Sequence, residues 1–252
     1  MFKKVTILLG ALIVLSLQVK ASNNELFTKA NEYYKKGAFD TAVVCYESIV
    51  KSGQESAELY FNLGNSYFKL KQNARAIVNF ERAHKLSPED EAISANLELA
   101  NALLTDKINV LPEFFLNKWY KKVLCIYTAD KWAKISISAF IFTLVLLLVY
   151  FFSRFILLKK ISFWFAVIAL GVSATSLSMA YKQEQLYISE KSAIVITASV
   201  TVKGSPDEAG TDLFVIHDGL KVEIIDQVGN WRNIKLPDGN KGWLKLSDIE
   251  VI

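Results

Sequence analysis

Hydrophobic residues are spread unevenly along this chain of 252 residues, and their spacing changes from one part to the next. Between residues 22 and 105 apolar positions recur every three or four residues, which is typical of amphipathic helices. Residues 135–152 and 161–181 are continuous apolar stretches without a charge. From residue 190 to residue 252 short β-rich runs alternate with turns that contain glycine. The pattern predicts a mixed multidomain protein with an all-α part, a pair of apolar helices and a small all-β part.

A motif recurs in the all-α part with a period of 34 residues. Its clearer copy reads Tyr60, Leu63, Gly64, Tyr67, Ala76, Phe80, Ala83 and Pro88. Ala30, Tyr33, Ala42 and Tyr46 align with Gly64, Tyr67, Ala76 and Phe80. The small residues allow the two helices of one unit to touch, the aromatic residues fill the seam beside them, and Pro88 ends the second helix.

This spacing resembles that of tetratricopeptide repeats (TPRs), which are helical hairpins that stack into scaffolds for binding other proteins. We expect a TPR domain over residues 22–105, with repeats at about 23–56 and 57–90 and a capping helix at 91–105. Because each repeat relies on its neighbours to bury its faces, a partner helix or a second copy is one way to complete so short a stack. The resemblance favours protein binding over catalysis.

A stripe of residues on the first helix of each predicted repeat is the candidate protein-binding site. Its six members are related by the 34-residue period: Phe27, Asn31 and Lys35, and then Phe61, Asn65 and Lys69. Spacings of four place them on one helix face, which in TPR proteins lines the concave groove. The Asn side chains can bond a peptide backbone and the Lys side chains an acidic group. The alternative is that the Phe residues pack between repeats and the Lys residues are only solvated.

The N-terminal residues 1–21 have the features of a secretory signal peptide. Lys3 and Lys4 precede an apolar centre, and small residues stand at the −3 and −1 positions of a cleavage site after Ala21. An uncleaved membrane anchor is the alternative. Either interpretation exports the TPR domain.

The two apolar stretches, residues 135–152 and 161–181, are predicted to form a transmembrane hairpin. As helices they would be about 27 and 32 Å long, enough for a hydrocarbon core of about 30 Å. The connector holds Arg154, Lys159 and Lys160 and no acid, so the positive-inside rule places it in the cytoplasm. Both soluble parts would then lie outside the cytoplasmic membrane.

Residues 106–134 are predicted to be an amphipathic linker. After Pro112, apolar residues recur every four positions, and three lysines lie on other faces of the expected helix. The apolar positions are Phe115, Trp119, Val123 and Tyr127, and the lysines are Lys118, Lys121 and Lys122. Such a helix could lie on the membrane surface or dock on the last repeat.

Residues 190–252 are predicted to form a small barrel, because about five short strands can bury a core only by closing on themselves. The expected strands are Val195–Lys203, Leu220–Ile225, Trp231–Leu236 and Gly242–Leu246, with a tight hairpin at Asp238-Gly239. The order of these segments resembles the bacterial SH3-like domain. Trp231 and Trp243 are interpreted as core residues, with a ligand platform as the alternative, and His217 as an exposed loop residue.

The composition and the motifs argue against nucleic-acid binding, a metal site and catalysis. A net charge of +4, without a basic run interleaved with aromatic residues, argues against nucleic-acid binding. Two cysteines without metal-type spacing and two histidines argue against a metal site. The sequence has no Ser/His/Asp or Cys/His grouping, P-loop or HExxH motif, so we expect neither an enzyme nor a cofactor.

The order of the parts carries the most specific resemblance. An export signal, two TPRs, a linker with Asp106-Lys107-Ile108, Leu111-Pro112, Phe114-Phe115 and Trp119, a membrane hairpin and an SH3-like tail resemble the BatE family. These are the TPR/SH3 proteins of the aerotolerance (Bat) operons of Bacteroidetes-type bacteria. The resemblance implies a bacterial cytoplasmic (inner) membrane protein with its TPR and SH3-like domains on the periplasmic side.

The partners that this resemblance implies are the von Willebrand A-domain membrane proteins of the same operon, with a MoxR-type ATPase on the cytoplasmic side. The predicted function is that of a membrane-anchored scaffold or adaptor in an aerotolerance or envelope stress complex. The alternative is an envelope protein that binds peptidoglycan through the SH3-like domain.

Overall fold

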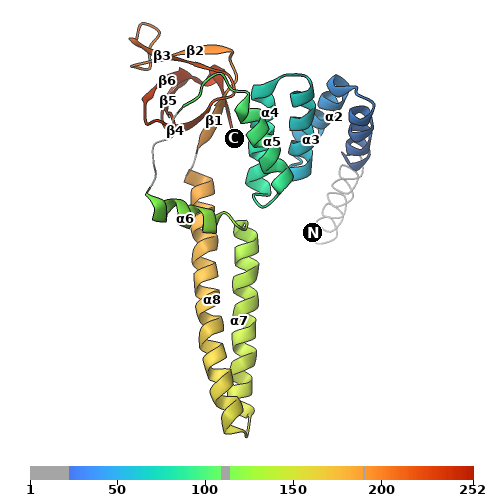
Figure 1. The fold of residues 1–252 in the computed structure, drawn as a ribbon, viewed down its shortest axis with the longest axis vertical. Helices are drawn as coiled ribbons and strands as arrows, with labels where there is room; N and C mark the ends of the chain where they lie inside the picture. The colour runs from blue at the N-terminus through green and yellow to red at the C-terminus, as the bar shows by residue number, and fades with distance from the viewer. Residues whose placement is uncertain (1–22, 109–113, 190) are drawn as a thin grey trace, which may run out of the picture. The chain divides into compact units, whose positions relative to one another are not determined.

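The computed structural model describes residues 23–108, 114–189 and 191–252 (Figure 1). The predicted signal peptide and part of the predicted linker, residues 109–113, lie outside the described residues. The chain divides into two compact units. One contains the N-terminal helices and the C-terminal sheet, and the other contains the two long apolar helices.

The N-terminal helices form two antiparallel hairpins and one further helix. Residues 23–35 are helical, and α2 (Phe39–Lys51), α3 (Ala57–Lys69), α4 (Asn73–Leu86) and α5 (Glu91–Ala102) follow. Helix α3 begins where the Ser56 hydroxyl accepts a hydrogen bond from the Leu59 amide. Helix α5 begins where the Asp90 carboxylate accepts from the amides of Ala92 and Ile93. These side chains satisfy amides that a helix leaves without partners in its first turn.

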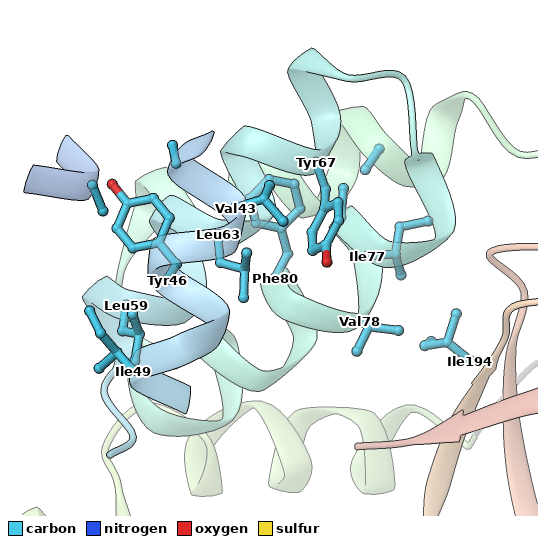
Figure 2. Close-up of a cluster of buried hydrophobic side chains, with 14 residues drawn as sticks. Val43, Tyr46, Ile49, Leu59, Leu63, Tyr67, Ile77, Val78, Phe80 and Ile194 are labelled. Atoms are coloured by element: carbon cyan, nitrogen blue, oxygen red, sulfur yellow. The ribbon is translucent and has the colours of Figure 1, made fainter. Parts of the chain in front are cut away.

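Most motif residues lie in the core of these helices, as the sequence predicts, but Tyr33, the counterpart of Tyr67 in the first repeat, is 38% exposed. Tyr46, Tyr67 and Phe80 are buried in the seam, together with aliphatic residues from α2, α3 and α4 (Figure 2). Gly64 faces the ring of Phe80 so closely that an added Cβ would lie 2.7 Å from two ring carbons. The glycine is therefore required by the close approach of α3 and α4.

The C-terminal part is an antiparallel sheet of seven strands. In chain order they are β1 (Ser192–Val195), β2 (Ser199–Lys203), β3 (Asp212–His217), β4 (Lys221–Val228), β5 (Trp231–Lys235), β6 (Lys241–Lys245) and β7 (Ile249–Val251). Their order in the sheet is β3-β2-β6-β5-β4-β1-β7. Among the described residues no ladder joins β3 to β7, so hydrogen bonds do not close the sheet into the predicted barrel.

Two details of this sheet differ from the sequence-based expectation. The expected strand Val195–Lys203 is divided between β1 and β2, and neither β3 nor β7 was predicted. The predicted hairpin is present: β5 pairs with β6, and Gly239 in the turn has a φ of 92°, where glycine is favoured.

The sheet packs against α4 within the first unit. Ile194 of β1 is fully buried and belongs to the same core cluster as Ile77 and Val78 of α4 (Figure 2). The Lys221 ammonium lies 2.7 Å from the Glu81 carboxylate, which is 9% exposed. Arg82 pairs with Glu250 of β7 at 2.9 Å. The sheet thus covers part of the second-helix side of the short stack.

The segment after α5 also contacts the sheet. The Asp106 carboxylate accepts hydrogen bonds from the His217 amide at 2.6 Å and lies 2.8 Å from its Nδ1 atom. Ile108 packs against the core of the sheet. His217 is therefore the last residue of an edge strand with a carboxylate partner, not the exposed loop residue expected from sequence.

The second unit contains two helices that are long and apolar enough to cross a membrane, α7 (Ala129–Phe152) and α8 (Ile156–Ser189). They pack side by side along their length (Figure 1). Ser136 and Ser173 each donate a hydrogen bond to the carbonyl of the other, at 2.9 and 3.0 Å, and both residues are buried. Hydroxyl groups of this kind hold apolar helices together where water is absent.

Candidate functional site

The six predicted site residues lie on the first helices of the two hairpins. We call the surface formed by Phe27, Asn31, Lys35, Phe61, Asn65 and Lys69 the first-helix face. Phe27 contacts the ring of Tyr46 edge-on, with ring centroids 5.8 Å apart, and Phe61 contacts Phe80 at 5.9 Å. Each Phe ring therefore packs against the second helix of its own hairpin, which agrees with the alternative interpretation that the Phe residues have a packing role.

The two Asn residues join neighbouring first helices. Asn62 donates to the Oδ1 atom of Asn31 at 3.2 Å, and Asn96 donates to the Oδ1 atom of Asn65 at the same distance. The Tyr46 hydroxyl adds a second hydrogen bond to Asn31 at 2.5 Å. These contacts form an amide ladder across the helix of residues 23–35, α3 and α5.

The amide ladder leaves a defined chemistry on the first-helix face. The acceptor oxygens of Asn31 and Asn65 are used inside the stack, whereas Asn Nδ2 groups carry two donors each. Lys35 and Lys69 are exposed at the same 34-residue interval. The face therefore combines hydrogen-bond donors with two cations, and such groups suit carbonyl and carboxylate groups of a bound peptide.

Asn62 and Asn96 belong to this arrangement but are not among the six residues predicted from the sequence. Asn96 follows Asn62 by the same 34 residues that separate Asn31 from Asn65. The signal was present in the repeat, but a hydrogen bond between two different repeat positions follows only from the stacking of the helices.

A polar cavity of about 410 Å³ lies on the second-helix side of the same unit. It is lined by residues of α2, α3, α4 and the sheet, among them Glu47, Tyr67, Arg75, Asn79 and Glu250. The Tyr67 hydroxyl donates to the Glu47 carboxylate, and the Arg75 guanidinium stands 5.6 Å from the centre of the Tyr67 ring. These interactions tie α2, α3 and α4 together beneath the cavity.

Burial and hydrogen bonding shift the ionisation of this cluster. Burial, with a contribution from the Glu47 hydrogen bond, raises the pKa of Tyr67 to about 12. The hydrogen bond from Tyr67 lowers the pKa of Glu47 against the opposing effect of burial. Burial also raises the pKa of Tyr46 to about 12. The two tyrosines therefore stay protonated, and Glu47 stays ionised, at neutral pH.

A second cavity, of about 300 Å³, lies within the sheet. Trp231 and Lys245 line it together with hydroxyl and charged side chains, and the Lys245 ammonium lies 5.8 Å from the Trp231 ring centre. Trp231 and Trp243 are only partly buried, and the core of the sheet is built from aliphatic residues. The expectation that both Trp residues form the core was wrong, because aliphatic side chains of the strands and their turns fill that space.

The described residues contain no group of three or more His, Cys, Asp or Glu residues arranged to hold a metal ion. The charged clusters described above are paired with one another or with tyrosine.

Comparison with known proteins identifies the repeats. A tetratricopeptide repeat model matches residues 57–90, and a second TPR repeat model matches residues 30–71. The chain is also similar to human tetratricopeptide repeat protein 16, with 27% identity over 85 residues. That alignment covers 32% of this chain and 10% of the human protein. Residues 30–90 therefore contain TPR repeats, a module for protein–protein interaction.

Proposed function

We propose that this protein is a membrane-anchored adaptor that binds a polypeptide partner on the first-helix face of its TPR repeats. The observation that carries the proposal is the amide ladder flanked by Lys35 and Lys69, repeated in both hairpins. Such donors can bond the main chain of a peptide, and the two lysines can pair with its acidic groups.

The anchoring part of the proposal rests on α7 and α8. Their length and composition suit a bilayer, and their serine contacts suit packing without water. The basic connector supports a cytoplasmic location for that turn under the positive-inside rule. The TPR repeats and the sheet would then lie on the periplasmic side of an inner membrane.

The packing of α4 against the sheet supports a common side for these two parts. The chain leaves the first unit before α7 and re-enters it after α8. Because Ile77 and Ile194 share one core cluster, the structure supports a topology in which both ends of the hairpin reach the same compartment. An even number of membrane crossings satisfies this requirement.

The partners that we propose are the von Willebrand A-domain membrane proteins of a Bat operon, in a complex served by a MoxR-type ATPase. This part rests on the resemblance in domain order to BatE-type proteins, including an SH3-like assignment for the C-terminal sheet. An aerotolerance or envelope stress role follows from that assignment alone.

Crosslinking in native membranes, followed by mass spectrometry and pull-down, tests the proposal. The variant Lys35→Glu/Lys69→Glu reverses two exposed charges without touching the amide ladder. Its matched control, Lys71→Glu/Lys107→Glu, makes the same charge change at exposed lysines outside the first-helix face. We expect partner capture to be lost in the first variant and kept in the control. Full capture by both would move the binding site to the sheet or to the apolar helices.

A second candidate function is peptidoglycan binding by the C-terminal sheet. The half-buried Trp231 beside hydroxyl-bearing residues in a cavity of about 300 Å³ favours it. Co-sedimentation of the protein with purified cell walls, compared with the Trp231→Ala variant, tests this function. Equal sedimentation of the two proteins would refute a role for this cavity.

A further inference from the structure

Helix α6 (Phe115–Leu124) exposes aromatic and aliphatic side chains that a water-facing helix would bury. Phe115 is 68% exposed and Trp119 is 64% exposed, one turn apart, and Leu116 and Tyr120 are exposed beside them. Residues spaced by four lie on one side of a helix. The apolar side of α6 therefore has no protein cover among the described residues.

The C-terminal end of α6 is fixed to the apolar hairpin. Leu124 is fully buried, and its carbonyl accepts a hydrogen bond from the Trp132 indole at 3.1 Å. The Trp132 ring also contacts Tyr127 edge-on, with ring centroids 5.3 Å apart. Helix α6 contacts α8 as well and runs across it rather than along it (Figure 1).

The attachment to Trp132 sets the level of α6 along the hairpin. Trp132 lies in the second turn of α7, between Lys131 and Lys134 and just before the apolar stretch that begins at Ile135. Tryptophan is enriched at the boundary between headgroups and hydrocarbon. A helix held at this level, across spanning helices, would lie in the plane of the membrane surface.

The charge of α6 suits the same location. Its sequence contains three lysines and no acidic residue, and Lys122 is exposed. A helix with an aromatic face and a basic polar face binds at the interface of bilayers that contain anionic lipids.

We propose that α6 is an interfacial helix whose Phe115–Trp119 side enters the outer boundary of the bilayer and whose lysines meet anionic lipid headgroups. The proposal rests on the proposed anchoring by α7 and α8. An interfacial α6 would anchor the hairpin at the membrane surface and would fix the depth and rotation, relative to the bilayer, of the segment that leads to the repeats.

Spin-label accessibility in reconstituted vesicles tests this proposal. The full chain with Cys45→Ser and Cys125→Ser would carry one label, at Phe115→Cys or Trp119→Cys. Two reference labels define the scale: Leu103→Cys, an exposed apolar position after α5, and Phe142→Cys, an exposed position in the middle of α7. The vesicles contain phosphatidylcholine with or without phosphatidylglycerol.

We expect the α6 labels to show a several-fold higher ratio of oxygen to nickel-complex collisions than the Leu103 label, and a lower ratio than the Phe142 label. Phosphatidylglycerol should raise the ratio at α6, and Lys122→Glu should reduce that increase. Ratios at α6 equal to that of Leu103, or labels shielded from both reagents as in a protein contact, would overturn the proposal. A Phe142 label in water would instead refute the anchoring itself.

Discussion

Enlarging Gly64 should destabilise the TPR repeats, because the residue lies where α3 and α4 approach most closely. A Cβ at this position would lie 2.7 Å from the Cδ1 and Cε1 atoms of Phe80 and 3.3 Å from the carbonyl oxygen of Ala76. Phe80 is only 1% exposed, and its ring also contacts Phe61. The ring cannot turn into solvent, so the two helices must separate or strain.

The expected loss follows from two opposing contributions. Overpacking a filled seam costs about 1–3 kcal/mol, whereas replacing glycine with alanine inside a helix stabilises it by about 1 kcal/mol. Gly64→Ala should therefore lower the free energy of unfolding by about 0–2 kcal/mol. Gly64→Leu brings three more carbons into the same seam, and we expect a loss of about 3 kcal/mol.

Cys45 provides a local probe for this prediction. It is partly buried against the TPR core in α2, so a thiol reagent should reach it fully only when the repeats open. Pulse labelling of the full chain in detergent and increasing urea, with Cys125→Ser, reports the opening of this region. Ser48→Leu, at an exposed position of α2, controls for the added leucine. An unchanged labelling midpoint in Gly64→Leu would show that α3 and α4 are not packed as described.

Three further predictions concern other parts of the molecule. Lys221→Ala leaves the buried Glu81 carboxylate without its ion partner and should destabilise the first unit by about 1–3 kcal/mol. Lys235→Ala removes an exposed ion pair and should cost only about 0–1 kcal/mol, so equal urea midpoints for the two variants would contradict this prediction. Burial raises the pKa values of Tyr46 and Tyr67 to about 12, so the stability that these two residues contribute is fully present below pH 10, the ordinary tyrosine pKa, and should fall between pH 10 and 12. Circular dichroism at alkaline pH can check this, and the Tyr67→Phe variant should lose less stability over the same pH range. Alkaline phosphatase fused after Thr105 or Ile252 should be active and fused at Ile156 inactive, and the reverse pattern would refute the proposed topology.

The sequence predicted the TPR helices well because their signals are local and repeated. Gly64, Ala76 and Phe80 constrain one another within a single hairpin, and Pro88 and Asp90 mark the boundary before α5. The same periodicity located the first-helix face. It could not show that Asn65 bonds Asn96, because that contact depends on how one helix stacks on the next.

The C-terminal part was less predictable. Strand β3 contains the continuous apolar run Leu213–Ile216, which lacks the period-2 alternation of a half-buried strand and so gives no clear strand signal. The burial of Ile194 against α4 depends on residues far apart in the chain, and no local pattern encodes it. The positions of Trp231 and Trp243 likewise depend on which side chains fill the centre of the sheet.

The discontinuous core around Ile77 and Ile194 has a consequence for how the protein is made. Its two halves are separated by about 80 residues, and closing a flexible loop of that length would cost about 4 kcal/mol of chain entropy. The antiparallel packing of α7 and α8 lowers this cost, because it returns the chain towards its starting level before β1 is synthesised. The buried face of α4 stays uncovered until that return is complete. Under the proposed anchoring, membrane insertion of α7 and α8 is a step in the folding of the first unit, and a variant that disturbs the Ser136–Ser173 contact should delay the maturation of that unit.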